Sequence, residues 1–130
     1  MTNFQQVTPF LHVADLQKAL DFFTGILGFH VPFRQPGYAY VHRETVAFRL
    51  LEVAEDEATK GDRRFAYYID VEDVDALYEE LKPRLDTMPP RDVHGPADKG
   101  YGQRELLVLA PDGNLIAFGM AIPQAEVAEA

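Results

Sequence analysis

Cysteine is absent from this sequence of 130 residues, and positive charge is scarce. Without cysteine, the chain forms no disulfide bonds, thiolate nucleophiles or zinc–thiolate centres. The 12 Lys and Arg residues stand against 21 Asp and Glu, which gives a formal net charge of −9. This balance argues against a nucleic-acid partner, because phosphates are bound by lysine and arginine. The acidity favours a cationic ligand by long-range attraction, or it serves only to keep the protein soluble.

Long apolar runs are also missing, and none approaches the ~20 residues that cross a membrane. The N-terminus lacks the basic and apolar regions of a signal peptide, so we expect a cytoplasmic protein without a membrane partner. With 47% hydrophobic and 25% charged residues, the composition is ordinary for a globular domain.

The first half of the chain alternates between strand-like and helical patterns. A strand is predicted over Val7–Val13. Because proline lacks an N–H, Pro9 predicts that this strand lies at a sheet edge or crosses between units. Asp15 is a favoured N-cap for a helix over 16–27, and Gly28 is suited to end that helix in the left-handed conformation. Three strand-like runs follow, at 29–33, 37–43 and 45–53.

The second half repeats this order after a polar, aperiodic stretch. A strand is predicted over 64–71, Asp73 is the next candidate N-cap, and Pro83 is expected to stop the helix. An irregular segment with a short strand follows, and it places His94 in a loop. The turn Pro111–Asn114 then joins two strands into a hairpin.

These halves predict a duplicated β-α-β-β-β plan. Val13–Leu16 matches Val71–Val74, which places the two candidate N-caps at equivalent positions. We therefore expect an α+β fold, in which two paired modules form a cupped mixed sheet around a cleft. Within one domain over 1–130, the boundaries are about 5–53 for module one, 54–63 for a linker, 64–120 for module two and 121–130 for a tail.

The segments "PFLHVADLQKALDFFTGILGF", "FAYYIDVEDVDALYEEL" and "YGQRELLVLAPDGNLIAFG" carry a family resemblance. Together they resemble the glyoxalase/bleomycin-resistance/extradiol-dioxygenase superfamily, the vicinal oxygen chelate fold, over nearly the whole chain. The family's usual Asp-Pro-Asp-Gly turn has Ala110 at its first position here, which removes only a turn side chain.

The resemblance implies where a metal ion would bind. Metal-dependent members use His, Gln and Glu, and the corresponding positions here are Thr8, Arg49, Ala66 and Ala117. Alanine offers no lone pair and arginine is a permanent cation, so we expect no metal and no cofactor. This expectation depends on strand register. The four histidines also show no spacing typical of a metal site.

The resemblance is strongest to the metal-free bleomycin-resistance proteins, which bind the drug without transforming it. In that group aromatic residues hold the flat part of the drug, and the matching residues here are Phe33, Tyr38 and Tyr101. Strand alternation adds Phe10, His12, Arg49 and Tyr68 as residues that face the cleft. The implied function is small-molecule binding, with antibiotic sequestration as the closest named match. The implied partners are a small flat or aromatic ligand and a second copy of the chain in a homodimer.

Several alternatives remain open at this point. Each aromatic residue could belong to the core or to a dimer contact, and Arg104 and Glu105 could form an ion pair at a strand end. The protein could instead be a lyase or dioxygenase, or a metal-free catalyst that uses His12 or Tyr68 as acid or base. A structural or regulatory dimer without a ligand is the third class. Arg49 favours an anionic ligand if it is unpaired, and a cationic ligand if a carboxylate neutralises it.

Overall fold

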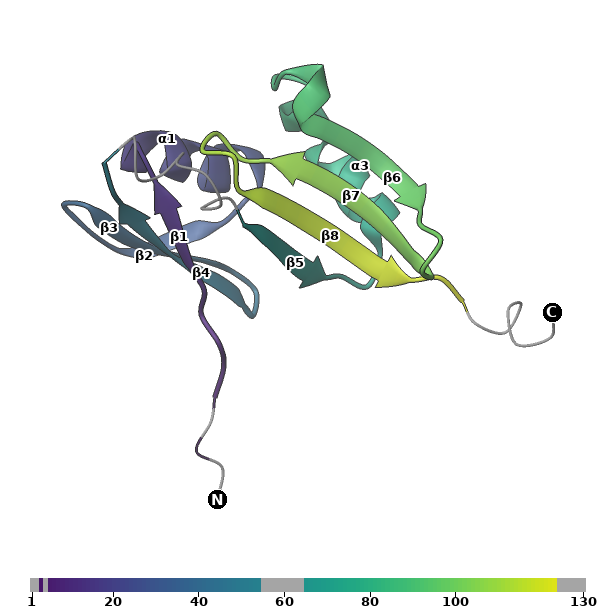
Figure 1. Ribbon diagram of the computed structural model, residues 1–130, viewed down its shortest axis with the longest axis horizontal. Helices are drawn as coiled ribbons and strands as arrows, with labels where there is room; N and C mark the ends of the chain where they lie inside the picture. Colours follow the sequence, from purple (N-terminus) through teal and green to yellow (C-terminus); the bar gives the residue numbers. More distant parts are fainter. Residues whose placement is uncertain (1–2, 4, 55–64, 124–130) are drawn as a thin grey trace. The chain divides into compact units, whose positions relative to one another are not determined.

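The structure is a computed structural model that describes residues 3, 5–54 and 65–123 (Figure 1). It divides into two compact units, Met1–Arg64 and Phe65–Ala130, here called the N-terminal and C-terminal units. The linker expected at 54–63 lies outside the described residues apart from residue 54, and so does the expected tail apart from 121–123. Each unit follows the predicted β-α-β-β-β order around its own four-stranded mixed sheet, as expected for an α+β fold.

The N-terminal unit builds its sheet in the order β1-β4-β3-β2, with β1 parallel to β4 and the other pairs antiparallel. The Asp15 carboxylate accepts a hydrogen bond from the Lys18 N–H at 3.1 Å, so the predicted N-cap is confirmed. After one regular turn and a half, the helix continues as a π-helical segment up to Gly28, which has φ 78°. The elements are β1 (Phe10–Val13), α1 (Leu16–Asp21), the π-helical segment (Phe22–Ile26), β2 (His30–Gln35), β3 (Tyr38–Arg43) and β4 (Val46–Glu52).

An aromatic cluster forms much of the core of the N-terminal unit. The ring of Phe23 lies 5.2 Å from that of Phe29 and 5.5 Å from that of Phe48, measured between centroids. Phe23 is only 1% exposed. The helical segment packs on one face of the sheet, where Leu11, Leu50 and other side chains of β1, β3 and β4 are buried. The opposite face of this sheet is called the open face of the unit.

The C-terminal unit has the equivalent order β5-β8-β7-β6, and α3 lies against one face of this sheet (Figure 1). Asp73 accepts a hydrogen bond from the Ala76 N–H at 3.0 Å, which confirms the second N-cap. The core here is mainly aliphatic, with Leu81, Leu106 and Ile116 fully buried and Phe118 as a buried aromatic side chain. The elements are β5 (Ala66–Asp70), α3 (Val74–Leu85), a 3₁₀ turn (Pro90–Asp92), β6 (Val93–Asp98), β7 (Gln103–Leu109) and β8 (Leu115–Ala121).

Two details of the C-terminal unit differ from the sequence-based expectation. Pro83 does not stop α3, which continues to Leu85. Proline here removes one hydrogen bond near the helix end, and burial of Leu85 in the core holds the last turn in place. His94 lies in β6 and not in a loop, because the strand pairs with β7 in spite of its Gly-Pro sequence.

The outer strands β2 and β6 share an irregularity. The pairing of β2 with β3 shifts register between His30 and Phe33, and that of β6 with β7 shifts between His94 and Ala97. A proline lies inside each shift, Pro32 in the first and Pro96 in the second. Both sheets therefore have one edge whose hydrogen-bonding pattern is interrupted.

The two helices begin against the last strand of their own sheets. The Leu16 N–H donates to Glu52 Oε2 at 2.8 Å, whereas the equivalent Val74 N–H lies 3.5 Å from the sulfur of Met120. A free N–H at a helix start is thus satisfied by a carboxylate in one unit and by a weak sulfur acceptor in the other. None of the helices within the described residues has both the length and the apolar character needed to cross a membrane.

Candidate functional site

Strand register brings the predicted residues of the N-terminal unit together on its open face. Phe10 pairs with Arg49, and Arg49 and Phe33 both pair with Tyr40, so these residues form one row across all four strands. The next row along the same face consists of His12, Leu51, Tyr38 and Gln35. Phe10 is 53% exposed and Phe33 is 51% exposed, so neither is a core residue of this unit.

Arg49 is the centre of this face. Its Nη1 donates a hydrogen bond to the Tyr38 hydroxyl at 2.5 Å, and its guanidinium carbon lies 5.2 Å from the centroid of the Tyr40 ring. The Phe33 and Tyr38 rings are tilted against each other at 6.0 Å. No Asp or Glu among the described residues forms an ion pair with Arg49. The arrangement is a partly buried cation held by tyrosines and flanked by an exposed phenylalanine.

Tyr40 is the residue that the sequence reasoning missed. Alternation from Tyr38 would have placed it on the same face, two residues further along the strand. Its hydroxyl accepts a long hydrogen bond from Gln6 Nε2 at 3.4 Å, and the same amide donates to the Thr8 hydroxyl at 2.9 Å. The stretch before β1 thereby reaches across to the third strand.

In the C-terminal unit, Tyr68 and Tyr101 take part in hydrogen bonds on the open face of that sheet. The Tyr68 hydroxyl donates to Gln103 Oε1 at 3.0 Å, and the Tyr101 hydroxyl donates to Glu105 Oε1 at 2.7 Å. Glu105 is only 5% exposed, whereas Tyr101, in the turn before β7, is 68% exposed. Tyr101 is thus an exposed aromatic ring whose hydroxyl is hydrogen-bonded to a buried carboxyl group.

The Tyr68 side chain lies directly over Gly119. A Cβ at position 119 would overlap the Tyr68 hydroxyl, so glycine here lets the ring lie against the strand. Burial, together with the neighbouring Glu105 carboxylate, raises the pKa of Tyr68 from 10.0 to about 12. Its hydroxyl therefore stays protonated at neutral pH and acts as a hydrogen-bond donor, which disfavours a role as a general base.

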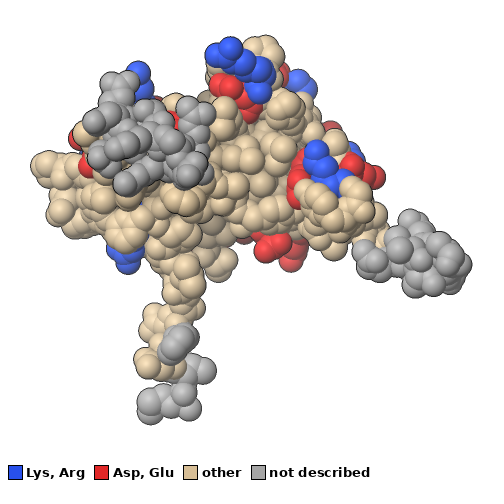
Figure 2. Space-filling view, in the orientation of Figure 1, with Lys and Arg blue, Asp and Glu red and all other residues tan. Residues whose placement is uncertain are grey.

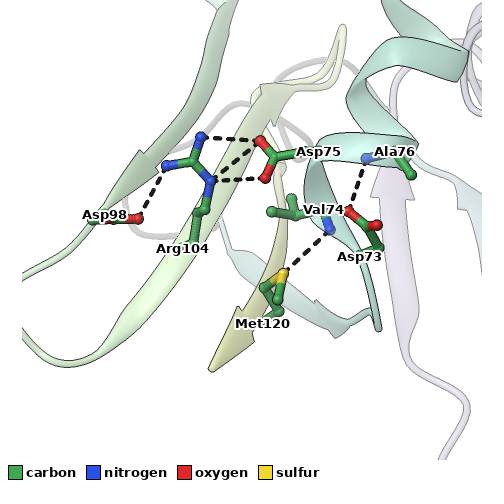
Figure 3. Close-up of polar contacts among 7 residues, drawn as sticks. All are labelled: Asp73, Val74, Asp75, Ala76, Asp98, Arg104 and Met120. Atoms are coloured by element: carbon green, nitrogen blue, oxygen red, sulfur yellow. Dashed lines mark hydrogen bonds and ion pairs between the residues drawn. The ribbon is translucent and has the colours of Figure 1, made fainter. Parts of the chain in front are cut away.

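Arg104 and Glu105 do not form the ion pair that the sequence suggested. Adjacent strand residues point to opposite faces, and Arg104 points to the face that α3 covers. There it donates to both oxygens of Asp75 at 3.0–3.2 Å and to Asp98 at 3.0 Å (Figure 3). The hydrogen bond to Asp75 is the main cause that raises the pKa of Arg104 further above its usual value. Arg104 is therefore a structural contact between α3 and the sheet, and it leaves the open face to Tyr101, Gln103 and Glu105.

The four positions at which the family would hold a metal offer no suitable set of donors. Arg49 lies on the open face of the N-terminal unit, Thr8 precedes β1, and Ala66 and Ala117 lie on the open face of the C-terminal unit. In the part of the chain that the structure describes, no group of three or more His, Cys, Asp or Glu residues could bind an ion. The residues present therefore do not fit a divalent metal centre.

Charge is dispersed on the face of the molecule drawn in Figure 2. Lys and Arg form small separate groups, some of them beside Asp and Glu, and most of the described surface in this view is neither basic nor acidic. No broad basic patch appears among the described residues on this face. The view offers no surface on which a polyanion would be held by charge alone.

Comparison with known proteins gives consistent results. Residues 4–118 match the model of the Glyoxalase/Bleomycin resistance protein/Dioxygenase superfamily. A bleomycin resistance protein of Geobacillus stearothermophilus is 30% identical over 128 residues, which covers 87% of this chain and 94% of that protein. The bleomycin-binding protein of Streptomyces verticillus, solved with copper(II)-bleomycin, superposes with a TM-score of 0.72 at 26% identity, covering 91% of this chain and 97% of the other. The bleomycin resistance determinant of transposon Tn5 has the same fold, with a TM-score of 0.75 at 21% identity over 91% of this chain and 98% of the other.

Proposed function

The chain belongs to the glyoxalase/bleomycin resistance protein/dioxygenase superfamily, and from this premise we propose that it binds a small planar molecule without a metal ion. Its proposed role is sequestration of an antibiotic of the bleomycin type, acting in the cytoplasm as a homodimer. The likeness to a bleomycin resistance protein along 87% of the chain supports this role.

The observation that carries the proposal is the open face of the N-terminal unit. Phe33, Tyr38 and Tyr40 lie around one arginine there, and Arg49 occupies a position at which the family would hold a metal ligand. Aromatic rings stack on flat conjugated ligands at ~0.5–1.5 kcal/mol per pair. Such a surface suits the binding of a planar molecule, because it offers ring faces for stacking beside the N–H donors of one guanidinium.

The direct test is calorimetric titration of the protein with metal-free bleomycin and with copper(II)-bleomycin. We expect saturable binding of at least one form, and expression of the protein should raise the bleomycin concentration that a sensitive bacterium survives. Tyr101→Ala should weaken the binding about tenfold or more, as expected for loss of a stacking anchor. Bleomycin sequestration would be contradicted if neither form gave a heat of binding in the titration and neither raised the melting temperature of the protein.

The homodimer is testable separately. Sedimentation at micromolar concentration should give a mass near twice that of one chain, because the family resemblance implies a homodimer. A mass near 14.7 kDa would contradict the dimer.

The second candidate function is a lyase or dioxygenase-like enzyme of the same superfamily. It requires a metal, which Thr8, Arg49, Ala66 and Ala117 do not fit. Purified protein should carry no stoichiometric divalent ion, and added nickel or zinc should produce no glyoxalase activity. One tightly bound ion per chain beside any of these four residues would favour the enzyme and overturn the metal-free proposal.

A further inference from the structure

We infer that the open face of the N-terminal unit recognises an acidic oxygen, a carboxylate or an enolate, on a planar ligand, and that Arg49 is the residue that binds it. This inference rests on the proposed function and deepens it, because it names the group on the ligand that the face selects. It assigns Arg49 as a specificity-determining residue rather than a structural one.

The geometry leaves Arg49 with free binding capacity. A guanidinium has about five N–H donors in a rigid planar fork. The Tyr38 hydroxyl takes one of them, and the other described residues give Arg49 only a ring contact, with Tyr40. The tyrosines hold the charged group in place, so that binding an oxygen pair costs little further side-chain entropy. Carboxylate and enolate oxygens match this fork better than any neutral acceptor does.

A second arginine in the same chain shows what a structural arginine looks like. Arg104 also sits on a central strand, but two carboxylates, Asp75 and Asp98, occupy its donors (Figure 3). Among the described residues no carboxylate pairs with Arg49, although acidic residues outnumber basic ones in the chain. A partly buried cation without an acidic partner is favourable where a ligand supplies the opposite charge.

The formal charge of −9 does not overrule this local preference. At physiological salt the field of distant surface charges decays over ~8 Å. Arg49 acts at contact distance beside aromatic rings, where one charge counts for more. Planarity of the ligand follows from the same neighbourhood, because Phe33 and Phe10 expose ring surface in the row that contains Arg49.

The test uses two probes of the same shape and opposite charge, naphthoate and naphthylmethylammonium, titrated by calorimetry. Wild-type protein should bind naphthoate more tightly than the ammonium compound. Arg49→Gln should weaken naphthoate about 10- to 100-fold, as expected for loss of a charge-assisted hydrogen bond, and should not weaken the ammonium probe. Arg49→Lys keeps the charge without the fork and should give an intermediate affinity.

Arg34→Gln is the matched control. Arg34 pairs with the fully buried Ala39, so it lies in the same sheet but on the face opposite to Arg49, and its removal changes net charge equally. This variant should leave the naphthoate affinity within about twofold of wild type, because exposed charges are screened. An equal loss in Arg34→Gln would mean that net charge and not the site selects the ligand, and it would overturn the inference.

Copper(II)-bleomycin, titrated in parallel, separates this inference from the proposed function. If bleomycin binds while both naphthalene probes bind equally and independently of Arg49, the inference is overturned and sequestration stands. If naphthoate binds in an Arg49-dependent manner while bleomycin does not bind, the inference stands and the bleomycin-type role is overturned. Circular dichroism of each variant shows that the fold is retained, and loss of fold in Arg49→Gln would itself show that Arg49 is structural and overturn the inference.

Discussion

The two units have the same strand order and matching pairing register, and yet equivalent rows of the two sheets carry different side chains. In the N-terminal unit the first open-face row is Phe10, Arg49, Tyr40 and Phe33. In the C-terminal unit the equivalent row is Tyr68, Ala117, Leu107 and His94. Where Tyr38 stands in the second row of one sheet, the buried Glu105 stands in the other. The strand order is duplicated, whereas the placement of polar groups is not. One open face carries Arg49, and the other carries a buried glutamate hydrogen-bonded to Tyr101.

The largest effect that would sharpen this comparison comes from the core of the N-terminal unit. Phe23→Ala removes the central ring of the aromatic cluster and should lower the free energy of unfolding by about 3–5 kcal/mol. Phe33→Ala removes the same type of side chain from the open face of the sheet. It should change the free energy of unfolding by less than about 1 kcal/mol. Urea unfolding followed by circular dichroism measures both. Similar losses in the two variants would mean that the open face is packed like a core.

A smaller effect is expected where the helices begin. Glu52→Met copies the residue at the equivalent position of the C-terminal unit and leaves the Leu16 N–H without its carboxylate acceptor. It should cost about 1–2 kcal/mol and speed the hydrogen exchange of the Leu16 amide. Met120→Leu keeps the volume and removes only a weak sulfur acceptor, so it should cost less than about 1 kcal/mol. Equal costs would show that the two helix starts do not differ in strength.

A pH-dependent effect should belong to the C-terminal unit alone, because Tyr68 has Phe10 as its equivalent in the other unit. The pKa of Tyr68 is about 12 in the folded protein, compared with 10.0 for a tyrosine in the unfolded chain. The unfolded chain therefore loses this proton first, and stability should fall as pH rises from about 10 to about 12. Tyr68→Phe should remove the highest step in the ultraviolet titration of tyrosine and flatten that fall. A stability profile that is unchanged by Tyr68→Phe would contradict the assignment.

The smallest effect is expected on the outer surface of the helices. Lys82 pairs with Asp86 at 3.1 Å on α3, and in α1 the Gln17 amide donates to Asp21 at 2.8 Å with the same spacing. Lys82→Gln should leave the urea midpoint within experimental error, and any change should vanish at high salt. A salt-independent loss would mean that Lys82 packs on the Tyr78 ring rather than pairing with Asp86.

Local chemistry made several parts of this fold predictable. Asp15 and Asp73 both cap helices as expected, and Gly28 and Gly113 both have positive φ, because each of these needs only its immediate neighbours. The helix over Pro83 was not predictable, since the burial of Leu85 that sustains it depends on tertiary contacts.

The site was less predictable from the sequence, because it depends on which residues of neighbouring strands lie opposite one another. Alternation placed Arg49 and Tyr38 on one face, but the hydrogen bond between them requires the pairing register of β3 and β4. Tyr40 was visible in the alternation and was overlooked. The pairing of Arg104 with Asp75 could not be predicted. Asp75 lies on a helix, and the strand pattern does not specify how that helix is rotated over the sheet.

The interrupted pairing of the edge strands β2 and β6 affects the tendency of the chain to aggregate at high concentration. In the proposed role of sequestration, each ligand molecule occupies one protein molecule, so the amount of protein has to match the dose. A high protein concentration promotes association of chains through the unpaired edges of their sheets. Pro32 and Pro96 remove an N–H from these edges at the point where the register also shifts, which makes both strands poor templates for a further strand. The two prolines thus disfavour association of copies of this chain through the edge strands β2 and β6.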